Sequence, residues 1–147
     1  MFHAGTNVGG FLRAKICFPG KSLDLYGRKG LIIGGIIWGI WHCPMVLMGL
    51  NYPRNPIIGL FLMLIFTVSV GIIFYYFYRR TGSVFAPALA HGVINWTGKT
   101  IMMLFINEDK INMLIDGPTG IPALFLLSFI AFILYLRIDW SAKKLTK

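Results

Sequence analysis

Apolar residues dominate four long stretches of the chain, and polar residues gather in the segments between them. The four stretches are residues 31–50, 57–78, 84–106 and 118–136. A helix needs about 20 apolar residues to cross the roughly 30 Å of hydrocarbon in a bilayer. Backbone polar groups at that depth are satisfied within helices. The pattern therefore predicts an all-α fold, a polytopic membrane helical bundle with about four transmembrane helices.

Residues 1–30 follow a different pattern, in which apolar side chains are mixed with arginines and lysines. Such a segment is too polar to cross a membrane and favours an element that lies along its surface. Pro19 and Gly20 divide it into two pieces. We therefore expect an interfacial segment at 1–30 and a transmembrane core at 31–147.

Composition supports a membrane protein. The 147 residues are 56% hydrophobic and 13% charged, whereas a soluble domain is about 25% charged. The net charge of +9 could indicate nucleic acid. However, the basic residues are scattered among short loops and ends, as in membrane proteins, so we expect lipid and no nucleic acid as a partner.

Basic residues alternate between the two sides of the expected bundle. They precede the first span, separate the second from the third and follow the fourth, at positions 13, 15, 21, 28, 29, 79, 80, 137, 143, 144 and 147. The other two loops hold only Arg54 and Lys110 as basic residues. The positive-inside rule then predicts a multi-pass protein of the plasma membrane with both termini cytoplasmic.

Two histidines lie within the expected spans, where ionisable side chains are rare and usually functional. His42 comes thirteen residues after Lys29, and His91 comes eleven after Arg80. At 1.5 Å per residue these are depths of roughly 20 Å and 17 Å. The first and third spans run in the same direction, so the two imidazoles could face each other near the middle of the bilayer.

Helical spacing gives each histidine a companion on its own face. Trp38 precedes His42 by four residues, and Asn95 follows His91 by four. Two imidazoles and an amide can bind a metal, hold a water or donate hydrogen bonds to an oxyanion. A zinc ion on His42 and His91 would lack the third protein ligand usual at catalytic sites.

Other interpretations of these polar residues remain open. The histidines could bond each other or nearby carbonyls and simply join the helices. They could also relay protons in a small transporter or channel subunit. Small residues on the same two spans, among them Gly35, Gly39, Ala86 and Ala90, predict that the first and third spans pack closely together.

Two sequence motifs carry a resemblance to a known family. The segment IIWGIWHCP, followed by YRRTGSVFAPALAHGVINW, resembles the CPBP family of intramembrane endopeptidases. This family comprises the type II CAAX prenyl proteases and the bacteriocin-processing or self-immunity (Abi) proteins. Trp38 and His42 match its aromatic-x-x-x-His motif, and His91 and Asn95 match its His-x-x-x-Asn motif. The resemblance covers about residues 10–96.

The resemblance implies peptide-bond hydrolysis inside the membrane, on a prenylated or other peptide substrate. His42 would help a glutamate to activate water, and His91 with Asn95 would stabilise the developing oxyanion. Trp38 and Trp41 would border the substrate pocket. The family is often described as metalloproteases, so a divalent metal such as zinc on His42 and His91 is left open. The implied location is a bacterial plasma membrane.

One family motif is missing. Glu-Glu-x-x-x-Arg should precede the tripeptide Gly10-Phe11-Leu12, but residues 4–9 contain neither glutamate nor arginine. The only glutamate in the sequence is Glu108. We expect an N-terminally truncated relic, a pseudoenzyme or a chain with a misassigned start. Whether it is an enzyme is open: it is either an endopeptidase impaired by itself, or a non-catalytic membrane protein acting in bacteriocin self-immunity or partner binding.

Overall fold

A computed structural model of the chain describes residues 20–105 and 112–140, and the side chains within 27–98 and 112–140. The described residues form four helices, α2 (Gly20–Leu47), α3 (Pro56–Thr81), α4 (Phe85–Phe105) and α5 (Ile121–Arg137). They contain no strand. The predicted all-α bundle is confirmed, and the ends of most helices fall within three residues of the expected spans. Residues 1–19 of the expected interfacial segment lie outside the described part.

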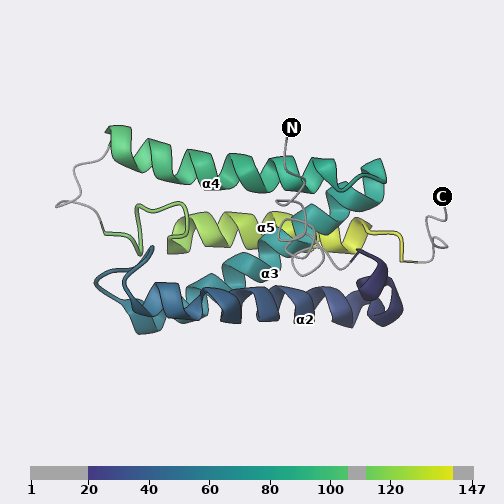
Figure 1. The fold of residues 1–147 in the computed structure, drawn as a ribbon, viewed down its shortest axis with the longest axis horizontal. Helices are drawn as coiled ribbons and strands as arrows, with labels where there is room; N and C mark the ends of the chain where they lie inside the picture. The colour runs from purple at the N-terminus through teal and green to yellow at the C-terminus, as the bar shows by residue number, and fades with distance from the viewer. Residues whose placement is uncertain (1–19, 106–111, 141–147) are drawn as a thin grey trace, which may run out of the picture.

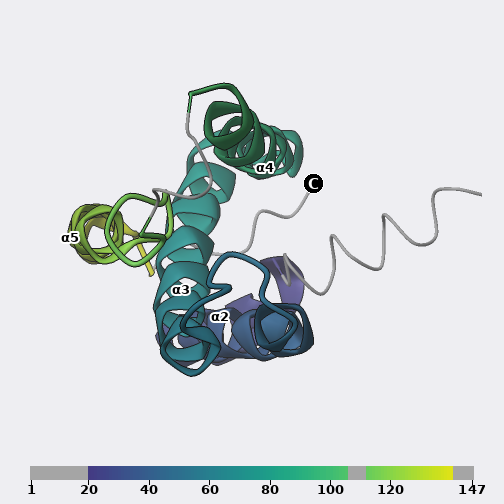
Figure 2. The ribbon, with the colours of Figure 1, turned by 90° about the vertical axis from the view of Figure 1, so that its left-hand side faces the viewer.

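Helix α3 is the centre of the bundle. It runs obliquely between the other helices, and α2, α4 and α5 each pack against it (Figures 1 and 2). Among the residues that the structure describes, no comparable interface joins α2 to α4. This arrangement explains why α3 buries residues on several of its faces, namely Gly59, Met63, Thr67, Ser69, Val70, Ile72, Phe74 and Tyr75.

Gly35 and Gly39 of α2 face α3, and this corrects the expectation that they pack against the third span. A Cβ atom at Gly35 would lie 2.7 Å from the Cα of Val68, and one at Gly39 would lie 2.7 Å from Leu64 Cδ2. On α4, a Cβ at Gly92 would meet nothing within 4 Å. The small residues do allow close helix approach, but the helix that approaches is α3.

Helix α2 is bent at Gly27, whose φ of 53° and ψ of −135° are not helical. A positive φ costs glycine little because it has no Cβ atom. The part of α2 that follows this bend, Gly27–Leu47, is long and apolar enough to cross a membrane. The expected boundary at residue 30 falls inside α2, because the helix begins at Gly20.

Two helices of the described part, Gly27–Leu47 and Pro56–Thr81, are long and apolar enough to cross a membrane. Helix α5 is apolar but has only 17 residues. Helix α4 has 21 residues but includes polar ones such as His91, Asn95 and Lys99. All four helices expose large apolar side chains, for example Ile37, Phe61, Leu89 and Phe125. A bilayer would cover such surfaces, which soluble monomers rarely leave exposed.

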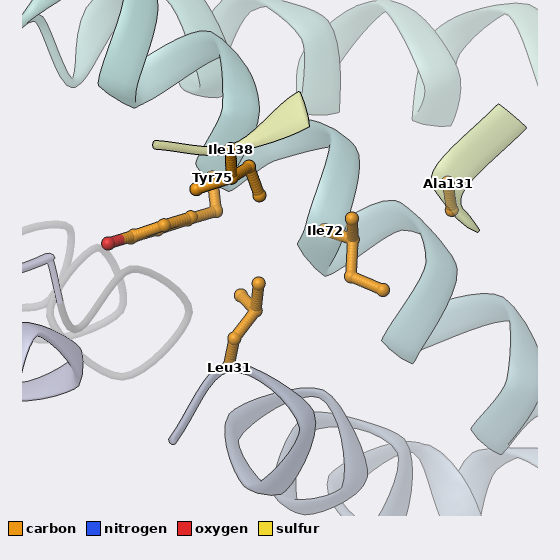
Figure 3. Packing of buried hydrophobic residues seen from close by; sticks show 5 residues of the cluster. All are labelled: Leu31, Ile72, Tyr75, Ala131 and Ile138. Carbon is orange, nitrogen blue, oxygen red and sulfur yellow. The ribbon is translucent and has the colours of Figure 1, made fainter. Parts of the chain in front are cut away.

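The buried core is divided along α3. At one end, Leu31 of α2, Ile72 and Tyr75 of α3, Ala131 of α5 and Ile138 form a cluster (Figure 3). A middle cluster contains Trp38, Val70 and Phe74. A third, at the opposite end, contains Val46, Tyr52 and Met63. The middle cluster is the one that supports the histidines.

Candidate functional site

Helix α2 presents Trp38 and His42 on one face, because four residues make about one helical turn. The His42 Nδ1–H donates a hydrogen bond of 2.9 Å to the carbonyl oxygen of Trp38. The two rings meet edge to face, with centroids 5.9 Å apart. A proton on Nδ1 leaves the lone pair on Nε2, so the nitrogen that remains is an acceptor, a base or a metal ligand.

A capped turn between α3 and α4 sets where α4 begins. Gly82 adopts the left-handed conformation that commonly ends helices, and its N–H donates to the Tyr78 carbonyl at 2.8 Å. The Thr81 hydroxyl donates to the Phe77 carbonyl at 2.8 Å. The Phe85 N–H then donates to the Ser83 hydroxyl oxygen at 3.2 Å. The Thr-Gly-Ser sequence thus holds the start of α4, which carries His91.

His91 meets α2 and α3 through aromatic rings. Its centroid lies 5.5 Å from that of Trp38 in an edge-to-face arrangement and 5.8 Å from that of Phe74. Trp38 and Phe74 are themselves 6.2 Å apart and are only 8% and 2% exposed. Trp38 therefore contacts both histidines, and the structure brings His42 and His91 together around one buried indole.

Asn95 is exposed and bonds its neighbour on α4. Its Nδ2–H donates to His91 Nε2 over 3.1 Å. Because Nε2 accepts this bond, the proton of the neutral His91 ring lies on Nδ1. The pair retains two kinds of N–H donor for a substrate, His91 Nδ1–H and the second hydrogen of the Asn95 amide. The chemistry of the pair is hydrogen-bond donation to an oxygen atom that carries negative charge.

Trp41 lies at the edge of the site. Its ring centroid is 5.0 Å from that of His42, and the side chain is 58% exposed. Of the two tryptophans expected to border a pocket, Trp38 is buried between the histidines and Trp41 is exposed beside His42. A cavity of about 410 Å³ lies elsewhere, lined by residues 49–55 and 112–114.

The donor set of the described residues does not fit a zinc centre. They contain no group of three or more histidine, cysteine, aspartate or glutamate side chains close enough to share a metal ion. A catalytic zinc usually has three protein ligands. The Nε2 atom of His91 is also engaged by Asn95. Two histidines, one of them already bonded to Asn95, fall short of that ligand number.

Phe74 is the residue of the site that sequence reasoning missed. It is one of many apolar residues on α3, and no motif singles it out. Its contacts with Trp38 and His91 depend on how three helices pack. No signal in the sequence alone could have distinguished it from its neighbours.

The fold and these residues define a helical membrane protein with a two-histidine polar site. The sequence matches the family described as type II CAAX prenyl endopeptidase Rce1-like over residues 12–97, which is more than half of the chain. The chain belongs to this family, and it is an integral membrane protein. The matched range includes Trp38, His42, His91 and Asn95. Comparisons with curated proteins and with solved structures gave no match.

Proposed function

We propose that the chain forms the histidine and asparagine part of a CAAX-type intramembrane endopeptidase site. The observation that carries this proposal is the convergence of His42 and His91 on Trp38 from two different helices. Ionisable groups within apolar helices are costly and usually functional. Membership of the family supports a protease-like site rather than a proton relay.

The tautomers support a role for each residue. In the tautomer that donates from Nδ1, the lone pair of His42 Nε2 can accept a proton from, or orient, an attacking water. His91 Nδ1–H and the Asn95 amide can donate hydrogen bonds to the oxyanion that forms when water attacks a carbonyl carbon. The hydrogen bond between Asn95 and His91 holds the two side chains in a fixed relative orientation. Trp38 and Trp41 would border the bound peptide.

The missing part of this machinery is a carboxylate. Glu108 is the only glutamate in the sequence, and it belongs to the segment between α4 and α5. A histidine without a carboxylate partner is a weaker base, since the carboxylate orients the ring and stabilises its charged form. We propose that this chain by itself is impaired or inactive as a protease.

The absent glutamates also favour a second candidate function. A non-catalytic member of the same fold could bind a peptide or a protein partner without cleaving it, for example in bacteriocin self-immunity. The Asn95–His91 pair, which lies beside Trp38, would then donate hydrogen bonds to a peptide carbonyl rather than to a transition state.

We further propose a four-pass arrangement in the plasma membrane of a bacterium, with both termini cytoplasmic. The alternation of basic loops supports this orientation. The ends that carry Arg28, Arg79 and Arg137 would face the cytoplasm. The loop with Tyr52 and the loop before α5 would face the opposite side.

The test is a cleavage and binding assay on the full chain, purified in detergent, with a fluorescent prenylated CAAX peptide. We expect no cleavage above that of the His42→Ala variant. We expect peptide binding to fall in His42→Ala but not in Cys43→Ala. Cys43 is the matched control because its thiol faces the Gly39 carbonyl, at 3.6 Å, rather than the site.

Cleavage that is lost in His42→Ala and kept in Cys43→Ala would show an active enzyme and overturn the proposal of inactivity. Equal binding by the native chain and both variants would overturn the proposed site.

A further inference from the structure

The bend in α2 and the last turns of α3 and α5 lie at the same end of the bundle (Figure 1). Each of these places carries arginine: Arg28, Arg79 with Arg80, and Arg137. Arg28 is the first residue after the bend at Gly27. Its guanidinium carbon lies 5.9 Å from the centroid of the Tyr135 ring and 5.5 Å from that of Trp140. A side chain of α2 thus reaches aromatic rings at the far end of the sequence, on and just after α5.

The aromatic rings beneath Arg28 are held firmly. Trp140 stacks on Tyr75 of α3 with centroids 5.8 Å apart and planes inclined by 19°. Tyr135 meets the edge of Trp140 at 5.4 Å. Both rings pack against the buried cluster shown in Figure 3. The Arg28 guanidinium therefore rests on a fixed aromatic platform. Such a platform reduces the side-chain entropy that Arg28 loses when a ligand binds.

Arg28 has no acidic partner among the described residues. Its recorded contacts are the two aromatic faces, and the side chain is exposed. A guanidinium that rests its face on a ring keeps its N–H donors at the edge, where they match the oxygen atoms of a phosphate. Because the Arg28 side chain is exposed, its donors remain accessible to a ligand.

Two neighbours enlarge this basic region. Arg80 lies 5.3 Å above the Tyr76 ring and donates from Nε to the Tyr76 hydroxyl at 3.1 Å. Arg79 donates from Nη2 to the Asp139 carbonyl at 2.7 Å, which ties the end of α3 to the residue before Trp140. Tyr76, Tyr135 and Trp140 all pack against the same buried cluster, so arginines of two helices lie over rings that border it.

The position of this region identifies its ligand class. It lies at the end of the apolar stretch of α2, where a bilayer changes from hydrocarbon to headgroups. Tyrosine and tryptophan favour that level, and arginines there attract anionic lipids. We propose that Arg28, Tyr135 and Trp140 form a binding site for the phosphate of an anionic phospholipid. This site is separate from the histidines and does not depend on peptide cleavage.

The test measures lipid binding to the full chain by native mass spectrometry in detergent, with phosphatidylglycerol and phosphatidylcholine as probes. We expect phosphatidylglycerol to bind more tightly than phosphatidylcholine. Arg28→Gln should weaken phosphatidylglycerol binding by more than the loss of about fivefold that one cation near a membrane surface contributes by charge alone, and by more than Lys29→Gln does. Lys29→Gln is the matched control, because it removes the same charge from the next exposed residue, which has no recorded ring contact.

A second variant, Trp140→Leu, removes the platform while Arg28 keeps its charge. We expect it to weaken binding in the same direction as Arg28→Gln. If Trp140→Leu fails to fold, the comparison of Arg28→Gln with Lys29→Gln still decides, because both side chains are exposed.

Equal losses in Arg28→Gln and Lys29→Gln would show general charge attraction and overturn the site. Equal binding of the two lipids would do the same. Displacement of the lipid by inorganic phosphate at comparable concentration would show an anion site without lipid preference, and would overturn the assignment to a phospholipid.

Discussion

Trp38 is the residue that joins the two halves of the candidate site. Its carbonyl fixes the tautomer of His42, and its ring supports His91. The indole ring is large and buried, and it contacts the rings of both histidines. At one end of the bundle, the buried side chain of Tyr52 likewise joins two segments that are distant in the sequence. It is 1% exposed, and its hydroxyl donates to the Thr119 carbonyl at 2.5 Å.

Tyr52 gives the first prediction at this scale, a pH dependence of stability. Burial raises the pKa of Tyr52 above its ordinary value near 10. A raised folded-state pKa means that the stabilisation is complete below pH about 10 and is lost as the pH rises further. Tyr52→Phe should therefore lose less stability than the native chain above pH about 10, although it costs about 1 kcal/mol near neutrality.

Thermal unfolding in detergent, followed by circular dichroism across the alkaline range, measures this difference. Identical alkaline losses in the native chain and Tyr52→Phe would contradict the role given to the buried phenol.

Close packing of α2 on α3 is the main relation between elements. Gly35 and Gly39 let the two backbones approach, while α4 contacts α3 mostly through larger side chains such as Phe74 and His91. In lipid, helices associate through van der Waals packing and hydrogen bonds, because apolar surface gains little by leaving lipid for protein. A hydrogen bond of 3.0 Å between Ser69 and Ser128 gives α3 and α5 such a polar contact.

Gly35→Ala should destabilise the bundle by about 1–3 kcal/mol, the usual cost of overpacking. The added Cβ would lie 2.7 Å from the Val68 backbone, so the helices would have to separate. Gly71→Ala on α3 is the control, because its Cβ would meet nothing within 4 Å. It should be neutral or stabilising by up to about 1 kcal/mol. Unfolding midpoints in a denaturing detergent compare the two, and equal effects would refute the close approach at Gly35.

At the scale of the whole molecule, α3 connects helices that otherwise have little contact. His42 and His91 belong to α2 and α4, which share no extended interface. The site therefore exists only because both helices pack on α3 at the level of Trp38 and Phe74. The same central helix brings the end of α5 beneath Arg28, which places the aromatic platform at the opposite end from Tyr52.

Single cysteines test the proposed orientation of the whole bundle, in a Cys17→Ser/Cys43→Ala background. Cysteines introduced at Pro53 and Asn112 should react with a membrane-impermeant maleimide on intact cells. A cysteine at Ser83 should react only after the membrane is permeabilised. This follows from the arginines beside Ser83, which favour the cytoplasmic side. Labelling of Ser83→Cys on intact cells would contradict the proposed orientation and indicate the reverse one.

The sequence by itself determined the four helices, the residues that share a helix face with each histidine, and the family. Long hydrophobic runs indicate helices, because a backbone that is buried in lipid or protein must satisfy its own hydrogen bonds. Helical spacing indicates which side chains share a face. Only the tertiary structure decided which helix each face meets. Gly35 and Gly39 pack on α3 rather than α4, Phe74 supports His91, and Arg28 reaches Trp140. These contacts depend on how helices distant in the sequence pack together, and a local pattern carries no information about its partner.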